Sequence, residues 1–121
     1  MRHYIGFDGG GTKTEMLVTD SRGEPLLNLI GGPCNPKSIT DKQSALTIIE
    51  LLDDGYNKGL LELGDCQGIC LGIAGIDTKA ERESISAVIQ QYYQNRHATV
   101  PSIYVTNDAE IALTAGLGSN N

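Results

Sequence analysis

The feature that constrains this chain most is a run of three glycines, residues 9–11, between two segments with strand character. Residues 2–8 have the pattern of a short strand with Ile5 and Phe7 on one face, and residues 14, 16 and 18 alternate with 15, 17 and 19 across a second strand. Consecutive glycines let the backbone take positive φ and bring amide N–H groups close to a ligand that a Cβ would keep away. The sequence therefore predicts a strand, a glycine turn and a second strand, with phosphate as a group that the turn fits.

The residues around the turn are suited to a metal-bound phosphate. Asp8 ends the first strand, where its carboxylate is placed to hold Mg²⁺ directly or through water. The hydroxyls of Thr12 and Thr14 and the ammonium of Lys13 are expected to face phosphate oxygens. A tight hairpin turn without a ligand explains the same glycines, because Gly-Gly between two apolar runs is itself a hairpin signal.

Two other phosphate motifs are excluded by their spacing. A P-loop needs a lysine directly after its second glycine, but Thr12 follows Gly11 and Lys13 comes one position late. A dinucleotide fingerprint needs a third glycine where Thr14 stands, and then a helix, whereas a strand follows here.

The run Asp8-Gly-Gly-Gly-Thr-Lys-Thr14 resembles the first phosphate motif of the actin, sugar kinase and heat-shock ATPase superfamily. Within that superfamily it is most similar to the BadF-type ATPases and the N-acetylglucosamine kinases. The resemblance implies that the cofactors are ATP and Mg²⁺ and that Asp8 is the metal-binding acid. It also implies that the nucleotide contacts are Asp8, Gly9, Gly10, Gly11, Thr12 and Lys13.

Composition limits the possible partners. The chain has 121 residues, enough for one domain, and its formal net charge of −6 argues against binding to nucleic acid or to an anionic membrane. It contains no apolar run of membrane-spanning length and no signal-peptide pattern, so a cytoplasmic location is expected. Cys34, Cys66 and Cys70 are odd in number and lack paired C-x-x-C spacing, which favours buried free thiols.

The rest of the chain predicts three further strands and three helices. Strand patterns cover 25–30, 68–74 and 102–106, and capping boxes at Thr40 and Thr78 begin two helices. The expected inner face of the first helix is Leu46, Ile49 and Leu52, widened by Ala45, Ile48 and Leu51, and that of the second is Ile85, Val88, Ile89 and Tyr92. A third helical pattern runs from 109 to 117.

This order of elements predicts an α/β fold. Three antiparallel strands continued by two parallel ones, each reached through a helix, give a mixed five-stranded sheet with flanking helices. This is the ribonuclease-H-like arrangement that the resembled superfamily uses for each of its lobes. The ending of the chain has loop composition, so residues 1–121 are expected to be one lobe of a longer protein whose second lobe is absent.

Ligands of α/β sheets gather at the carboxyl ends of parallel strands. Three groups follow such ends, namely Asp8, the stretch 75–77, and Asn107 with Asp108. An ordinary N-cap at the start of a helix explains Asp108 equally well.

The resemblance assigns roles to these groups. It implies that Asp108 is the general base that takes a proton from a sugar hydroxyl. It also implies that Asn35, in the loop after the third strand, binds sugar hydroxyls, and that the loop carrying Gly75 and Asp77 lies at the hexose pocket. Asn107 is grouped with these substrate contacts. Without the resemblance, Asn35 is a turn residue before Pro36.

The leading hypothesis is therefore an ATP-dependent kinase of an amino sugar, with N-acetylglucosamine as substrate and a homodimer left open. One alternative is an ATPase that activates a 2-hydroxyacyl-CoA dehydratase or a benzoyl-CoA reductase. Such activators more often read Gly-Ser-Thr-Thr where this chain has Gly11-Thr-Lys-Thr14. A sugar-sensing regulator without catalysis is the other alternative.

Overall fold

The computed structural model describes residues 2–34 and 41–107. Its elements follow the predicted order: β1 (His3–Gly9), β2 (Thr14–Asp20), β3 (Pro25–Gly31), α1 (Asp41–Asn57), a short 3₁₀ turn (Leu63–Asp65), β4 (Cys66–Ile73), α2 (Lys79–Asn95) and β5 (Ser102–Thr106). The expected helix over 109–117 lies outside the described residues.

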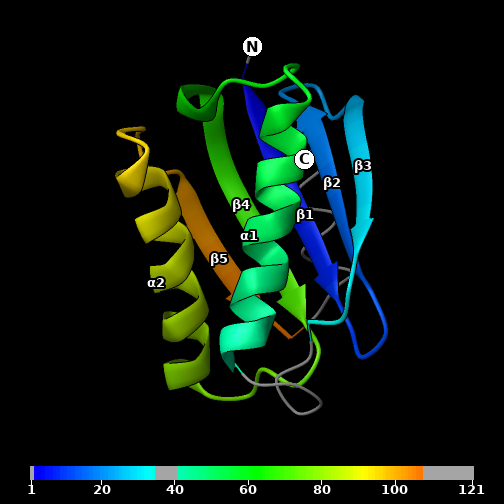
Figure 1. Cartoon of the computed structure of the whole chain (residues 1–121), viewed down its shortest axis with the longest axis vertical. Helices are drawn as coiled ribbons and strands as arrows, with labels where there is room; N and C mark the ends of the chain where they lie inside the picture. The colour runs from blue at the N-terminus through cyan, green and yellow to red at the C-terminus, as the bar shows by residue number, and fades with distance from the viewer. Residues whose placement is uncertain (1, 35–40, 108–121) are drawn as a thin grey trace.

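The five strands form one mixed sheet in the order β3-β2-β1-β4-β5. β1 pairs antiparallel with β2, and β2 with β3, whereas β4 pairs parallel with β1, and β5 with β4. The arrows of β1, β4 and β5 consequently point the same way in Figure 1. The predicted fold class is confirmed: three antiparallel strands followed by two parallel ones reached through helices.

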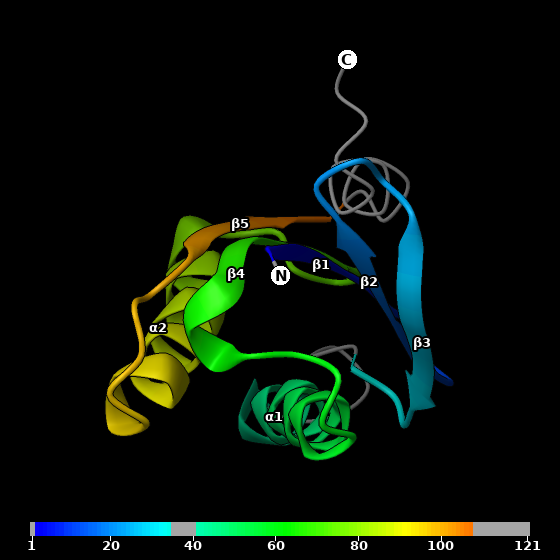
Figure 2. The same cartoon turned by 90° about the horizontal axis from the view of Figure 1, so that it is seen from above.

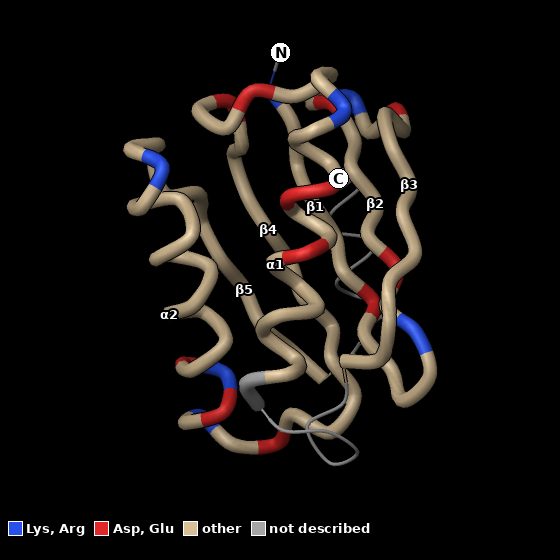
Figure 3. The backbone as a smooth tube through the Cα atoms, viewed as in Figure 1, with Lys and Arg blue, Asp and Glu red and all other residues tan. Residues whose placement is uncertain are grey.

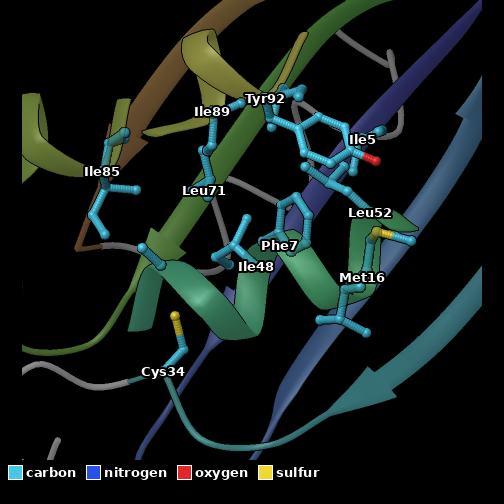
Figure 4. Close-up of a cluster of buried hydrophobic side chains, with 14 of the residues drawn as sticks. Ile5, Phe7, Met16, Cys34, Ile48, Leu52, Leu71, Ile85, Ile89 and Tyr92 are labelled. Carbon is cyan, nitrogen blue, oxygen red and sulfur yellow. The ribbon is translucent and has the colours of Figure 1, made fainter. Parts of the chain in front are cut away.

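Both described helices cover the same face of the sheet (Figure 2). The core lies between this face and the helices, and Figure 4 shows its centre, where Phe7 of β1 and Leu71 of β4 meet Ile48 of α1 and Ile89 of α2. Phe7 and Leu71 are fully buried. None of the described helices is long and apolar enough to cross a membrane.

The predicted inner face of α1 was wrong at one position. Leu46 is 47 % exposed, whereas Ala45, Ile48, Leu51 and Leu52 are buried. Two apolar stripes overlap on this helix, and the sequence pattern does not tell which of them meets the sheet. α1 also continues through Gly55 and ends at Asn57, before Gly59, which has a φ of 79°.

The predicted start of α2 is confirmed. Thr78 is its N-cap, the hydroxyl of Thr78 accepts from the amide of Glu81 at 3.1 Å, and the Glu81 carboxylate accepts from the amide of Thr78 at 3.0 Å. This reciprocal pair satisfies amides that have no partner inside the helix. The start of α2 is therefore fixed directly after the loop that follows β4.

Candidate functional site

Three strand ends meet at one edge of the sheet. In the parallel register, Asp8 of β1 lies beside Gly72 of β4, and Gly72 lies beside Thr106 of β5. Since neighbouring strands are about 4.8 Å apart, Asp8 and Thr106 lie about 10 Å apart across this row. Gly72 has no side chain, so the row carries polar oxygens only at its two ends. The chain thus brings together segments that are almost a hundred residues apart in sequence.

The turn between β1 and β2 has its carbonyl groups held from inside the protein. The Gly9 carbonyl accepts from the amide of Ala74, and the Gly10 carbonyl from the amide of Cys34, both at 2.9 Å. The amide of Gly10 donates to the Lys13 carbonyl at 2.9 Å and closes the turn. The loops that follow β3 and β4 therefore fix the orientation of the turn.

The exposed part of the same turn carries backbone amides that are available as hydrogen-bond donors. Gly11, Thr12 and Lys13 are exposed. Their amides form no backbone hydrogen bond with any residue that the structure describes. Successive amides that face solvent form an anion-binding concavity, and the ammonium of Lys13 adds positive charge there. Figure 3 shows this single basic segment between the ends of β1 and β2, next to acidic ones.

One of the two expected reasons for the glycines, positive φ, was wrong. Positive φ among the described glycines occurs at Gly23, Gly59 and Gly75, and not in the run 9–11. Gly9 is instead favoured by close approach, because a Cβ built on it would stand 3.0 Å from the Cβ of Cys34. At Gly10 the nearest atom to such a Cβ is the Lys13 carbonyl oxygen at 3.6 Å, which is ordinary contact.

Asp8 is available to a metal ion. It is half-buried, and its carboxylate forms no hydrogen bond or ion pair within 2–34 and 41–107. The directly opposite residue on β2 is Glu15, which accepts from Asn28 at 2.8 Å. Like charges in such a pair repel each other, and a divalent cation relieves the repulsion.

The described side chains can supply only part of the ligands that surround a Mg²⁺ ion. No group of three or more His, Cys, Asp or Glu side chains suited to a metal occurs among the described residues. Mg²⁺ is commonly held by one or two carboxylates together with water and substrate phosphates, so Asp8 next to the free amides of the turn suits it.

The expectation for Thr14 was also wrong. Thr14 is fully buried and its hydroxyl donates to the Gly32 carbonyl at 2.7 Å, so it does not face the outer side of the turn. The sequence did contain the signal, because Thr14 shares the apolar face of β2 with Met16 and Val18.

The other predicted site residues lie around the same edge. Gly75 follows β4 with a φ of 88°, and Asp77 and Asn107 are exposed at the ends of the β4 and β5 loops. Asn35 and Asp108 lie outside the described residues. The structure therefore brings Asp8, residues 9–13, Gly75, Asp77 and Asn107 to the carboxyl edge of the parallel strands.

Cys34 is a residue that the sequence did not connect with the site. It is fully buried against Gly9, and its thiol donates to the Ser44 carbonyl at 3.4 Å. Burial raises the pKa of Cys34 to about 11. The thiol therefore stays protonated at neutral pH and serves as a packing group rather than as a nucleophile.

The geometry can now be compared with known proteins. No family model matches the chain. It is 35 % identical over 117 residues to an N-acetylmuramic acid/N-acetylglucosamine kinase of Clostridium acetobutylicum, which covers 97 % of this chain and 37 % of the relative. The chain is similar to sugar kinases. An N-acetyl-D-glucosamine kinase of Dictyostelium discoideum is 27 % identical over 124 residues, covering 93 % of this chain and 36 % of that protein.

A solved structure agrees on the fold. The crystal structure of a protein from Chromobacterium violaceum assigned as an N-acetylglucosamine kinase superposes with a TM-score of 0.61 at 23 % identity. The match covers 96 % of this chain and 39 % of that protein. The chain thus spans a little over a third of the length of each of these three proteins.

Proposed function

We propose that this chain forms part of an ATP-dependent kinase that phosphorylates an amino sugar, with N-acetylglucosamine or N-acetylmuramic acid as the acceptor. The observation that carries the proposal is the turn between β1 and β2. The Gly9 and Gly10 carbonyls accept from Ala74 and Cys34, while the amides of the exposed residues Gly11, Thr12 and Lys13 form no backbone hydrogen bond within 2–34 and 41–107. The names of the two sugar kinase relatives support the choice of reaction.

In this proposal the turn binds the phosphates of ATP. Phosphoryl transfer depends mainly on alignment and on neutralising charge at the moving phosphoryl group. The free amides and the ammonium of Lys13 supply donors and positive charge for phosphate oxygens. Asp8 would hold Mg²⁺ directly or through water, and the ion would screen the phosphate charge.

The acceptor sugar would lie toward β4 and β5. Gly75 and Asp77 follow β4, about one strand spacing from Asp8, and Asn107 follows β5, about two strand spacings from Asp8, at the same edge. Asp108 follows Asn107 directly, and we assign it as the base for the sugar hydroxyl, with Asn35 as a further sugar contact. A carboxylate suits the base role because the attacking hydroxyl needs a nearby proton acceptor.

The experiment is an ADP-release assay on the protein expressed from the complete gene, with N-acetylglucosamine, N-acetylmuramic acid, glucose and no sugar. We expect ADP release that depends on the amino sugar and on Mg²⁺. Asp108→Asn should lower kcat by about 100-fold or more, as expected for loss of a general base. Sugar-independent ATP hydrolysis with iron–sulfur absorbance would instead identify a dehydratase or reductase activator, and sugar binding without turnover would identify a regulator.

Asp8→Asn is a second variant for the same assay. Loss of the carboxylate should raise the Mg²⁺ concentration needed for half-maximal rate, because the amide is a weaker ligand. Asp20→Asn is the matched control, since Asp20 ends β2 at the opposite end of the sheet and only caps its own turn through Arg22 and Glu24. An unchanged Mg²⁺ requirement in Asp8→Asn would contradict the metal assignment.

A further inference from the structure

The turn between β1 and β2 has one of the two backbone hydrogen bonds that join the ends of a two-residue β-hairpin. The Gly10 amide donates to the Lys13 carbonyl at 2.9 Å. The reciprocal bond, from the Lys13 amide to the Gly10 carbonyl, is absent from the described part of the chain. An ordinary hairpin turn commonly has that bond, because the carbonyl of its first residue accepts from the amide of its fourth. The Lys13 amide therefore lacks the acceptor that a closed turn would give it.

The Gly10 carbonyl is bound by Cys34 instead. The Cys34 amide donates to it at 2.9 Å. A peptide group is planar and trans, so its C=O and its N–H point to opposite sides. Because the Gly10 carbonyl points at the buried residue Cys34, the amide of Gly11, which belongs to the same peptide group, points away from the core. A single hydrogen bond thus orients the Gly11 amide outward and occupies the acceptor that Lys13 would use.

The backbone conformation agrees with an open turn. A carbonyl oxygen has two lone pairs, so the bond from Cys34 does not by itself exclude a second one from Lys13. The two hairpin turns that match the twist of the flanking strands, types I′ and II′, need positive φ at the first central residue. Gly11 holds that position, and its φ is not positive. The turn therefore does not have the conformation that favours closure.

Contacts with α1 hold Cys34 in place. Its side chain is fully buried, and its thiol donates to the Ser44 carbonyl at 3.4 Å. Figure 4 shows Cys34 at the end of the segment after β3, with its sulfur turned toward α1. The Pro33 carbonyl, which belongs to the same peptide group as the Cys34 amide, accepts from the Thr47 hydroxyl at 3.0 Å. This peptide group is therefore fixed on one side by α1 and on the other by the turn.

We infer that Cys34 is a positioning residue whose amide keeps the phosphate turn open, so that the amides of Gly11 and Lys13 stay available to phosphate oxygens. The inference rests on the proposed function, in which the turn binds ATP. Cys34 touches no ligand in this scheme and acts through the Gly10 carbonyl. Without the Cys34 amide, that carbonyl would accept from Lys13, and the turn would lose a phosphate donor.

The test compares Cys34→Pro, which removes the amide hydrogen, with Cys34→Ala, which removes the thiol and keeps the amide. Cys66→Ala is the matched control for loss of a buried thiol, because Cys66 lies beside His3 at the opposite end of β1. All are made in the protein expressed from the complete gene. KM values for MgATP and for sugar, unfolding free energies, and amide hydrogen exchange at Lys13 and Cys34 without nucleotide are measured.

We expect the KM for MgATP of Cys34→Pro to rise about tenfold or more, the size of one lost hydrogen bond to a charged group. The sugar KM should change less than about twofold, well below the size of one hydrogen bond. Exchange at the Lys13 amide should become slower, because this amide gains the Gly10 carbonyl as acceptor. General loosening of the structure would make it faster, so the direction of the change separates positioning from a merely structural role.

The two alanine variants set the scale of the effect. Cys34→Ala should raise the KM for MgATP by less than about threefold, because the hydrogen bond to Gly10 is kept. Cys66→Ala should lower stability without raising that KM. A folded Cys34→Pro variant with the wild-type KM for MgATP overturns the inference, and so does faster exchange at Lys13 in this variant. An equal rise of the KM in Cys34→Ala and Cys34→Pro overturns it as well.

The unaltered protein gives a result that depends neither on the fold of Cys34→Pro nor on activity. Slow exchange at the Cys34 amide together with fast exchange at the Lys13 amide supports the open turn. A Lys13 amide protected as strongly as that of Cys34 overturns it. If the unaltered protein phosphorylates no sugar, the proposed function fails by itself, and this exchange comparison still decides whether Cys34 keeps the turn open.

Discussion

Gly9 lies directly against Cys34, at a distance where a Cβ on Gly9 would stand 3.0 Å from the Cβ of Cys34. The end of β1 and the segment after β3 are therefore in close contact at a position where any side chain would be crowded. Gly10 is not constrained in this way, because the nearest atom to a Cβ built on it would be the Lys13 carbonyl oxygen at 3.6 Å.

Gly9→Ala is expected to lower the free energy of unfolding by about 1–3 kcal/mol, since an inserted methyl group forces the Cys34 segment away from the turn. Gly10→Ala is the matched variant, because its new Cβ would meet nothing closer than 3.6 Å. It should change stability by less than about 1 kcal/mol. Urea unfolding of both variants checks the prediction, and equal losses would contradict the packing argument.

Gly75→Ala should also be destabilising, but for a conformational reason. Gly75 has a φ of 88°, and an alanine in the left-handed region costs about 1–2 kcal/mol. Gly64→Ala is the control, because nothing lies within 4 Å of a Cβ there and its φ is not positive. Thermal unfolding should separate the two, and a Gly75→Ala variant as stable as Gly64→Ala would argue against this backbone conformation.

A chain of side-chain hydrogen bonds joins β1 to α1 and α2. His3 Nε2 lies 2.8 Å from the Tyr56 hydroxyl, which lies 2.8 Å from the Tyr93 hydroxyl. Tyr56→Phe removes both bonds and should cost about 2 kcal/mol, whereas Tyr93→Phe removes one and should cost about 1 kcal/mol. Denaturant unfolding of both variants gives the order of the two stability losses from the midpoints, provided that the m-value is unchanged. A larger loss for Tyr93→Phe would contradict this account of the network.

Stability should fall at alkaline pH. Burial raises the pKa of Cys34 and of Cys66 from 9.0 to about 11. The folded state therefore keeps both thiol protons at pH values where the unfolded chain has lost them. The free energy of unfolding should be constant below about pH 9 and then decrease up to about pH 11, by at most about 2.7 kcal/mol for each thiol.

The control for this prediction is the double variant Cys34→Ala, Cys66→Ala, which should show a shallower decrease between pH 9 and 10. A slope will remain above that range, because burial also raises the pKa of Tyr56, Tyr92 and Tyr93. An unchanged slope in the double variant would assign the alkaline effect to the tyrosines alone.

Local patterns predicted much of this structure. The strand patterns in 14–19 and 102–106 and the capping box at Thr78 are decided by residues close in sequence, so these strands and the start of α2 follow from sequence. The inner face of α1 did not follow, because Leu46 and Ile48 are equally apolar and only packing distinguishes them.

The sequence by itself determined the order of elements, the mixed sheet and the presence of a glycine turn after an acidic strand end. Tertiary structure decided what the turn residues do. The inward direction of Thr14 follows from the alternation of β2, but its bond to Gly32 depends on the pairing of β2 with β3, and the tight contact at Gly9 depends on Cys34, 25 residues later. Such contacts depend on strand register and on close approach between distant segments, and local sequence patterns carry no information about either.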